Sequence, residues 1–468
     1  MSILGLQLDD AAFAVARDGA PLGAAAPSIV HADPADAARY GAPAMDIARR
    51  APHRVSYGHW AAFGAVAGAT DEAAARAAFA VARAELRQRV APQLAPGDRL
   101  QLAVPAALDA AALGWVLAAC RQKSLPVAGF HDAAALGVAA LGLEGEVIVP
   151  AVGLTQLSAT RVVVADGEAR RRSARVSREV GLLSVQQRWL EMIAEAMVLR
   201  SRFDPLHEAA SEQRLYDLLP AAAARAAREG STTIELPAGA SSCAVTLSRD
   251  QFAAAARPLT RALAASIDAL RPDGASPTVL LSAALLELPG VVEALSAVPG
   301  ARLYAMDADF VARAASALPV AADAPVDAGV EEVPLRRGVP VMAPIDEARP
   351  IEVATEAVRA TPTHVLWRGA TIALPPGAAL EIGREPAADG IRLDEGLAGV
   401  SRLHCTLRHG PDGVQVVDHA AYGTWLNGHR VAGRARLAAG DRLRVGDPGV
   451  EFALIAVGTG AAAEAGTG

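Results

Sequence analysis

The chain has 468 residues, of which 52% are hydrophobic and only 4% aromatic, and its formal net charge is −7. This length predicts two or three domains, and the mild charge, without a dominant basic tract, argues against nucleic acid as a partner. Asp, Arg, Gly or Pro interrupts every long apolar stretch, so no membrane span is expected. The three cysteines lack pair spacing and the N-terminus becomes acidic early, which indicates a cytoplasmic protein without disulfides or a zinc cluster.

Residues 1–318 alternate short strands with longer helices, which predicts a layered α/β domain. Strands are expected at residues 3–8, 100–104, 147–152, 160–164 and 278–281. Helices are expected at residues 72–90, 108–122, 181–199, 211–229 and 247–270. The second helix has Asp109 near its N-terminus, where a negative charge favours the helix dipole, and the last begins with a capping-box pattern at Ser248.

Residues 319–363 change character, because prolines recur and few apolar positions are periodic. This composition predicts a proline-rich linker. From residue 364 to residue 457 short alternating segments are separated by glycines, which is typical of an all-β sandwich. Its strands are expected at residues 372–374, 379–382, 406–408, 414–417, 424–426, 442–445 and 451–455. Residues 458–468 are expected to form a disordered tail.

Polar and glycine motifs follow one another in this C-terminal segment. They are Gly383-Arg384, then Ser401-Arg402-Leu403-His404, then the stretch from Asp418 through Gly423-Thr424 to Asn427-Gly428. A phosphate dianion requires charge-assisted donors on a rigid surface. Two arginine side chains and a serine hydroxyl, presented by neighbouring loops of a sandwich, can supply them. The ordinary alternative is that these arginines are only surface residues.

In their order and spacing these motifs resemble the forkhead-associated (FHA) domain family over residues 364–457. The resemblance implies that a phosphothreonine peptide binds at a surface formed by Arg384, Ser401, Arg402, Tyr422 and Asn427. It implies structural roles in loops and turns for Gly383, His404, Asp418, Gly423, Thr424 and Gly428. His404 is therefore expected to brace a loop rather than to catalyse a reaction, and Asn427-Gly428 to form a hairpin turn.

One stretch departs from that family. The family commonly has Ser-x-Asn before Gly-Thr, and its asparagine holds the peptide backbone, whereas this chain has Ala420-Ala421-Tyr422. Ala421 has no hydroxyl and Tyr422 cannot imitate a bidentate amide, so the loss is expected to cost a few kcal/mol of peptide affinity. Two outcomes stay open: weak phosphothreonine binding, or a contact that does not depend on phosphate.

The N-terminal segment carries a second resemblance. Its motifs are Pro27-Ser28-Ile29-Val30, Val104-Pro105 followed by a helix, Leu125-Pro126-Val127, the run from His131 to Leu136, and Leu247 to Phe252. In this order they are similar to the nucleotide-binding domain of DnaK-type heat-shock chaperones. Those chaperones belong to the actin-like ATPase superfamily, so the resemblance implies a duplicated ribonuclease H-like fold for residues 1–318.

The phosphate-binding loops of that superfamily are degraded here. The first hairpin reads Gln7-Leu8-Asp9-Asp10-Ala11 instead of Asp-x-Gly-Thr-Thr, and the second keeps only Gly153 and Thr155. The adenosine loop reads Ala283-Ala284-Leu285-Leu286-Glu287 and has lost its glycines and arginine. Side chains occupy the space that backbone needs near a nucleotide, and two carboxylates repel phosphate. These changes predict a pseudo-ATPase without catalytic residues, cofactor or metal, in which Asp9 and Asp10 are solvated turn carboxylates rather than metal ligands.

The leading hypothesis is an adaptor or scaffold that recruits a threonine-phosphorylated protein and offers a second protein-binding surface on its degenerate α/β domain. A variant has the FHA domain bind phosphorylated Thr355, Thr361 or Thr363 of the linker, although solvated linker threonines are the simpler interpretation. The alternative is a chaperone-like ATPase switch that binds ATP and Mg²⁺ and is regulated by phosphopeptide. A third is a structural subunit of a bacterial assembly whose FHA domain binds without phosphate. No counterpart of the chaperones' peptide-binding β-domain is found, which argues against a folding chaperone.

Overall fold

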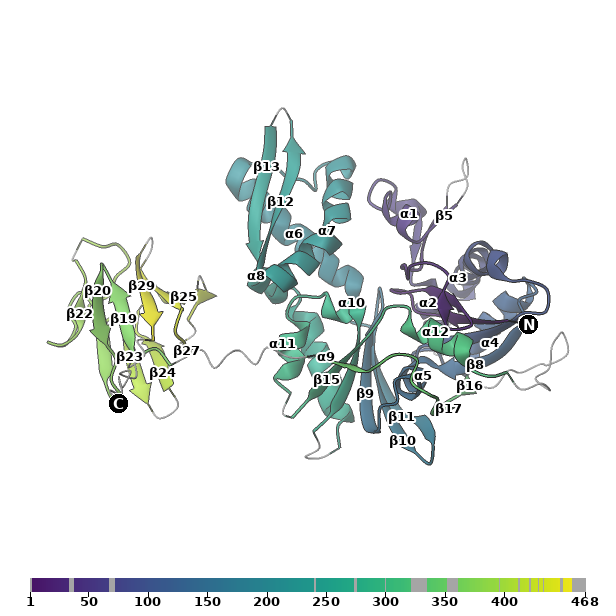
Figure 1. Cartoon of the computed structure of the whole chain (residues 1–468). Coiled ribbons are helices and arrows are strands. Elements are labelled where there is room, and N and C mark those ends of the chain that lie inside the picture. The colour runs from purple at the N-terminus through teal and green to yellow at the C-terminus, as the bar shows by residue number, and fades with distance from the viewer. Residues whose placement is uncertain are drawn as a thin grey trace, which may run out of the picture. The chain divides into compact units, whose positions relative to one another are not determined.

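The computed structural model describes residues 2–32, 38–66, 72–239, 241–272, 276–298, 300–320, 335–351, 361–394, 396–410, 413–420, 422–427, 429–431, 433–446 and 449–456. The chain divides into two compact units, unit 1 (residues 1–353) and unit 2 (residues 354–468) (Figure 1). Within the described ranges no helix combines the length and apolar character that crossing a bilayer requires. The chain is therefore multi-domain, with a mixed α/β unit followed by an all-β unit.

The first sheet of unit 1 begins with an antiparallel meander and continues with parallel strands. The meander is β1 (Ile3–Gln7), β2 (Ala14–Arg17) and β3 (Ala20–Pro21), and β7 (Arg99–Val104), β8 (Val127–Asp132) and β16 (Leu335–Arg336) follow on the other side of β1. The order across the sheet is β3-β2-β1-β7-β8-β16, with β7 parallel to β1 and β8 parallel to β7.

The second sheet repeats this order. Its meander is β9 (Gly145–Val152), β10 (Leu157–Ala165) and β11 (Glu168–Ser177), and its parallel strands are β14 (Thr278–Ser282) and β15 (Arg302–Met306). The order β11-β10-β9-β14-β15 matches β3-β2-β1-β7-β8, with β14 parallel to β9 and β15 parallel to β14. Unit 1 is thus built from two halves with one strand topology.

Each half contributes a helix to the sheet of the other half. Helix α5 (Ala133–Ala140) follows the first sheet and packs on β10 and β11, whereas α12 (Phe310–Ala317) follows the second sheet and packs on β1 and β2. The approach of α12 is so close that a Cβ on Gly5 would overlap the carbonyl oxygen of Ala312. Glycine is therefore required at the centre of β1, and the exchange of helices joins the halves through buried surface.

Insertions extend both halves. The first half adds β4 (Ile29–His31), β5 (Arg39–Tyr40), α1 (Ala42–Met45), β6 (Val55–Tyr57), α2 (His59–Val66) and α3 (Glu72–Glu85), and it continues through a π-helical turn, Leu86–Val90. Helix α4 (Ala110–Arg121) joins β7 to β8, and Asp109 lies at its N-terminus as predicted, where its side chain also accepts a capping hydrogen bond from the Ala112 N–H. Figure 1 shows α1 and α7 of the two insertions on the same side of the sheets.

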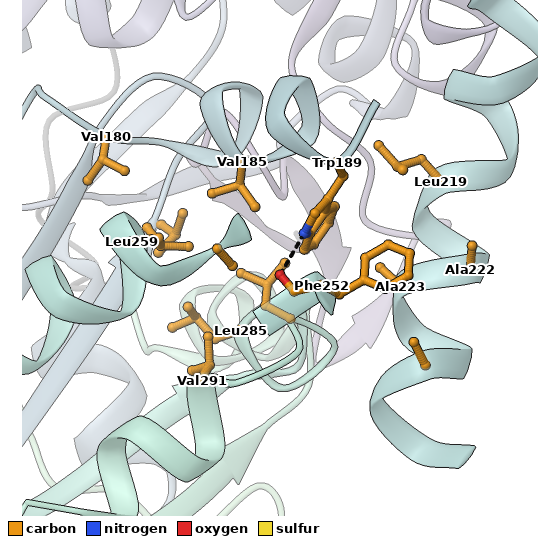
Figure 2. Packing of buried hydrophobic residues seen from close by; sticks show 14 of the residues in the cluster. Val180, Val185, Trp189, Leu219, Ala222, Ala223, Phe252, Leu259, Leu285 and Val291 are labelled. Carbon is orange, nitrogen blue, oxygen red and sulfur yellow. Dashed lines mark hydrogen bonds between the residues drawn. The ribbon is translucent and has the colours of Figure 1, made fainter. Parts of the chain in front are cut away.

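The second half adds α6 (Leu182–Ser201), α7 (Ala209–Glu229), the hairpin β12 (Ser231–Ala238) and β13 (Ser241–Ser248), α8 (Arg249–Ala255) and α9 (Arg257–Leu270), with α10 (Ala283–Leu286) and α11 (Val291–Ser296) between β14 and β15. The core of this insertion forms around Trp189, whose indole N–H donates to the Phe252 carbonyl at 2.9 Å (Figure 2). The two rings meet edge to face with centroids 5.5 Å apart.

The helix predicted at residues 247–270 is two helices. Strand β13 continues through Ser248, which forms the predicted capping box with Gln251 and starts α8. Helix α9 begins at Arg257 with a proline in its first turn. Proline has no N–H to donate to the preceding turn, so one helix ends and another begins near it. The apolar periodicity of the sequence continues across this break, which is why a single helix was predicted.

Part of the predicted linker belongs to the sheets of unit 1. Within residues 319–363, β16 pairs with β8, β17 (Gly338–Pro340) pairs with β11, and β18 (Arg349–Pro350) pairs with β15. The prolines in β17 and β18 lie on short strands at sheet edges, where a missing N–H is tolerated. We therefore correct the linker prediction for residues 335–350, which we call the strap.

Unit 2 is a sandwich of two sheets. One contains β20 (Ala370–Ala373), β19 (His364–Trp367), β29 (Val450–Ile455), β28 (Arg442–Val445), β25 (Thr424–Leu426) and β26 (His429–Arg430) in this order. The other contains β22 (Ile391–Arg392), β21 (Ala379–Gly383), β23 (Cys405–Gly410), β24 (Gly413–Asp418) and β27 (Arg434–Leu437). Alternate apolar residues of both sheets form the core, which includes Ile382, Leu407, Val416 and Phe452. The tail predicted at residues 458–468 lies outside the described residues.

Candidate functional site

Two loops of unit 2 are joined by backbone hydrogen bonds. The loop that starts at Gly383 meets the loop 401–404, because the Arg384 N–H donates to the Ser401 carbonyl at 3.1 Å and the Glu385 N–H donates to the Arg402 carbonyl at 2.9 Å. A Cβ on Gly383 would overlap the Arg402 carbonyl oxygen, so only glycine permits this approach. The first two sequence motifs, which are separated in the chain, are thus adjacent in space.

The side chains of Arg384, Ser401 and Arg402 on these loops have no partners within the described part of the chain. Neither Arg384 nor Arg402 forms an ion pair there, and the Nε of Arg384 is buried without a hydrogen-bond acceptor. Arg402 is exposed, and the hydroxyl of Ser401 is half-buried without a protein partner. Unpaired guanidinium groups attract anions, and a buried Nε–H without an acceptor is costly unless a ligand supplies one.

The buried side chain of His404 connects the loop 401–404 to the turn at Gly423. Its Nδ1 accepts a hydrogen bond from the Ser401 N–H at 3.2 Å, and its Nε2 lies 3.0 Å from the Gly423 carbonyl. A nitrogen that accepts carries no proton, so the ring is neutral with its proton on Nε2, which donates to Gly423. Burial lowers the pKa of His404 below its ordinary value, which agrees with a neutral ring. The side chain is fully buried, as a structural role requires.

A second brace holds the loop between β24 and β25. The Asp418 carboxylate accepts from the Thr424 hydroxyl at 2.7 Å and from the Ala420 N–H at 3.1 Å. Gly423 has a φ of +87°, a backbone conformation that residues with a side chain rarely adopt, so this position also favours glycine. Next to it the Tyr422 side chain is 67% exposed. Ala421 lies outside the described residues.

Asn427 differs from its expected place on the peptide surface. Its Nδ2 donates to Asp441 at 2.9 Å, and its Oδ1 accepts from the Arg442 N–H at 2.9 Å. Its φ of +50° and the pairing of Leu426 with His429 fit the predicted hairpin turn. The second turn residue, Gly428, lies outside the described residues. Because the fold itself uses the amide, Asn427 stabilises a turn and does not offer a free group to a peptide.

In unit 1, the turns after β1 and β9 meet through Asp10. Its Oδ1 accepts a hydrogen bond from the Leu154 N–H at 2.9 Å, and its carbonyl accepts from the Ser28 N–H at 2.7 Å. The carboxylate lies so close to Gly153 that a Cβ there would overlap Oδ1. The two hairpins are therefore joined by a carboxyl group of the chain itself.

Asp9 and Asp10 are not the solvated turn carboxylates that the sequence predicted. Asp10 is only 7% exposed and its Oδ2 has no hydrogen-bond partner, because the second hairpin and Gly58 enclose the side chain. Burial, together with the nearby charge of Asp9, raises the pKa of Asp10 to about 7. Asp9 is half-buried, its Oδ1 accepts from the Ala11 N–H at 2.9 Å, and burial raises its pKa as well.

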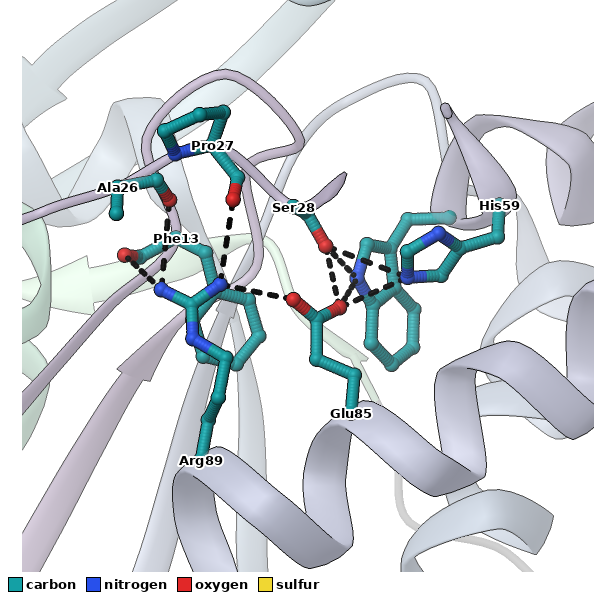
Figure 3. Close-up of polar contacts among 8 residues, drawn as sticks. Phe13, Ala26, Pro27, Ser28, His59, Glu85 and Arg89 are labelled. Atoms are coloured by element: carbon teal, nitrogen blue, oxygen red, sulfur yellow. Dashed lines mark hydrogen bonds and ion pairs between the residues drawn. The ribbon is translucent and has the colours of Figure 1, made fainter. Parts of the chain in front are cut away.

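A buried polar cluster, not expected from the sequence, supports the first hairpin. Arg89 donates to Glu85 at 2.8 Å and to the Phe13 carbonyl at 3.2 Å, while His59 and Ser28 bond the other carboxylate oxygen of Glu85 (Figure 3). Burial raises the pKa of Glu85, but the hydrogen bond and charge of His59 and the charge of Arg89 outweigh it, so the pKa lies below its ordinary value. The sequence motif Pro27-Ser28-Ile29-Val30 lies at this cluster, but it did not indicate the buried acid.

The cleft beside these hairpins has an acidic and apolar lining. Gln7, Asp9, Ala284, Asp307 and several alanines line it, and no Lys or Arg is among the described residues that do so. Gln7 donates through Nε2 to the carbonyls of Ala12 and Ala308 at 2.9 and 3.0 Å, which leaves only its Oε1 without a partner. Thr155 is exposed at the second turn, and Ala283 starts α10. Nothing in this lining neutralises a phosphate chain.

Comparison with known proteins identifies the second unit. Residues 380–446 match the model of the FHA domain, and this stretch contains both linked loops and the braces around His404 and Asp418. The chain therefore carries an FHA domain, a protein-interaction module. The match does not extend to residues 1–318. No curated protein matches this chain.

Proposed function

We propose that this protein is an adaptor whose FHA domain binds a threonine-phosphorylated partner through Arg384, Ser401 and Arg402. One observation carries the proposal: two guanidinium groups without an ion-pair partner in the described residues extend from loops that backbone hydrogen bonds hold together. A phosphate ester carries a charge of about −1.5 to −2 and three acceptor oxygens at neutral pH. It matches two cations and a hydroxyl better than any single-charge ligand does.

Contacts within the domain hold the loops of the site in place without a ligand. Gly383 fixes the distance between the loops, and His404 fixes the second loop to the turn before β25. Less conformational entropy is lost on binding when the donors are already in place. The exposed Tyr422 lies beside Gly423 and offers an apolar ring to the peptide, in place of the family's asparagine amide. We therefore expect phosphate to dominate the affinity and the peptide backbone to contribute little.

The linker threonines are poor ligands for this site. The Thr363 N–H donates to the Ile455 carbonyl and its hydroxyl lies 2.8 Å from Nδ1 of His364, so this residue is part of the sandwich. Thr361 is half-buried, and Thr355 lies outside the described residues. The geometry at Thr363 supports a separate phosphorylated protein as the ligand.

Calorimetry on the full chain tests this proposal. A phosphothreonine peptide is titrated beside the same peptide without phosphate, and the Arg408→Ala variant serves as a control because Arg408 is an exposed arginine elsewhere in the same module. We expect heat only with the phosphopeptide, and equal affinity for the control variant. Equal binding of both peptides would instead support a phosphate-independent module.

For unit 1 we propose an actin-like fold related to DnaK-type chaperones that neither hydrolyses nor tightly binds ATP. The repeated strand order and the exchanged helices α5 and α12 support the fold. The carboxylate of Asp10 between the hairpins and the absence of cations among the described lining residues support the loss of ATP binding. A thermal-shift measurement with ATP and Mg²⁺ tests this, since tight binding would raise the melting temperature and overturn the proposal.

A further inference from the structure

Strand β11 has an open edge over residues 172–177. Its first three residues pair with β17, and the Arg171 N–H donates to the Arg337 carbonyl at 2.9 Å, but no strand of the described ranges pairs with the outer side beyond that point. The side chains from Arg172 to Val176 are all exposed. An edge of this kind presents unpaired backbone N–H and C=O groups to another chain.

The charges along this edge are positive and unbalanced. Of the neighbouring arginines, Arg161 pairs with Glu146, Arg170 with Glu168 and Arg171 with Asp132. Arg172 and Arg175 are exposed and have no ion-pair partner in the described residues. Two exposed arginines that pair with no described acid, beside an edge that no described strand covers, favour an acidic ligand in extended conformation.

The two faces of the edge differ. Ala174 lies opposite Thr160, and Val176 lies opposite Ser158, so all four share one face of the sheet. Ser158 and Thr160 line the cleft, which makes this the cleft face, and Val176 is 39% exposed there. Arg175 points to the other face, because successive residues of a strand alternate. A matching strand therefore carries apolar residues toward the cleft face and acidic residues toward Arg175.

We propose that an acidic, extended segment of a partner protein binds here by adding a strand to β11 along residues 172–177. The inference rests on the proposed adaptor function. It specifies where the second partner binds, at the edge of β11, and what it presents there, an acidic extended segment. A second copy of this chain fits poorly, because two such edges would bring Arg172 and Arg175 against the same arginines. The register shift opposite Arg161 and Val162 leaves Arg172 as an extra residue, and such a bulge limits unselective strand pairing.

Fluorescence anisotropy tests the proposal on the full chain, with a labelled peptide of alternating Glu and Val as the probe and a Lys and Val peptide as its opposite. We expect the acidic peptide alone to bind, and Arg175→Glu to weaken it by roughly tenfold, since an exposed attraction becomes a repulsion. Arg225→Glu, on an exposed arginine of α7, is the matched control and should bind as the original chain does. Amide exchange should slow at residues 173–177 when the acidic peptide is present.

Other outcomes separate this site from the FHA domain. Loss of acidic-peptide binding in Arg384→Ala together with normal binding in Arg175→Glu would place the peptide on the FHA domain and overturn the inference. Binding that survives Arg384→Ala but not Arg175→Glu supports the β11 edge even if phosphopeptide binding fails. Binding that appears only after Asp323, Asp327, Glu331 and Glu332 are replaced by serine would make the chain's own acidic segment the occupant and would also contradict the proposal.

Discussion

The linked loops of unit 2 and the linked hairpins of unit 1 are both pairs of turns in close contact, but they carry different groups: arginines in unit 2 and the carboxyl group of Asp10 in unit 1. In each place two turns, distant in sequence, approach until only glycine fits, at Gly383 in one and at Gly153 in the other. In unit 2 the guanidinium groups of Arg384 and Arg402 form no ion pair with another described residue, whereas in unit 1 the Asp10 side chain accepts a hydrogen bond from the backbone N–H of the facing hairpin. The loops of unit 2 leave room for an anion, whereas in unit 1 the side chain of Asp10 already fills the space between the hairpins.

The largest effect is expected from the cluster that supports the hairpin in unit 1. Glu85→Ala leaves Arg89 and His59 buried without their acid, which should lower the free energy of unfolding of unit 1 by about 3–5 kcal/mol. Chemical denaturation followed by tryptophan fluorescence measures this, with phosphopeptide binding as the control for unit 2. Because the pKa of Glu85 is lowered in the folded state, this stabilisation is present above the ordinary glutamate pKa and is lost as the pH falls below it.

Removing the cations of unit 2 should give the next largest effect. Arg384→Ala or Arg402→Ala removes a charged donor, and each should weaken phosphothreonine-peptide binding by about 10- to 100-fold, as charge-assisted hydrogen bonds of 1.5–3 kcal/mol imply. Stability should change little, because neither guanidinium pairs with another described residue. Calorimetry measures the affinity. Unchanged affinity in both variants would show that these arginines do not bind the phosphate and would contradict the contrast drawn with unit 1.

A smaller effect should follow from the charge on Asp10. Its pKa is raised to about 7, so the folded state holds the proton more tightly than the unfolded chain does, and stability falls as the pH rises from about 4 through 7. Asp10→Asn should flatten this dependence, on the order of 1 kcal/mol between pH 6 and pH 8. Thermal melting across pH measures it. A variant as pH-dependent as the original chain would show that another group is responsible.

The smallest expected effect concerns His404. Its pKa is lowered by burial, so protonation is disfavoured in the folded state, and unit 2 should lose stability as the pH falls below about 6.5, the ordinary histidine value. We expect a loss of about 1 kcal/mol or less near pH 5.5, together with weaker phosphopeptide binding, because Nδ1 can no longer accept from the Ser401 N–H. NMR titration of the ring measures its pKa, and a value above 6.5 would contradict the neutral brace.

The sequence predicted the FHA domain well because its signals are local. Gly383, His404 and Gly423 are each fixed by neighbours within one module, and the family match agrees with the motif order. The hydrogen bond between the Asp10 side chain and the Leu154 N–H could not be predicted from local patterns. The two residues are 144 positions apart, and nothing near Asp10 in the sequence indicates that it accepts this bond. The strap was missed for another reason: edge strands of two or three residues leave no periodic apolar pattern, and the prolines of β17 and β18 resemble those of a linker.

The position of the strap also predicts which part of unit 1 yields first when a partner bound to unit 2 exerts force on the chain. Residues 335–350 add a strand to β8 in one half and to β11 and β15 in the other, and they lie immediately before unit 2 in the chain. We therefore expect a pull on a captured partner to reach β18 first, a strand of only two residues at the edge of the second sheet. We expect β18 to separate from β15 before any other strand of unit 1 is pulled apart, so that the loss of this edge strand spares the rest of the α/β unit from mechanical load.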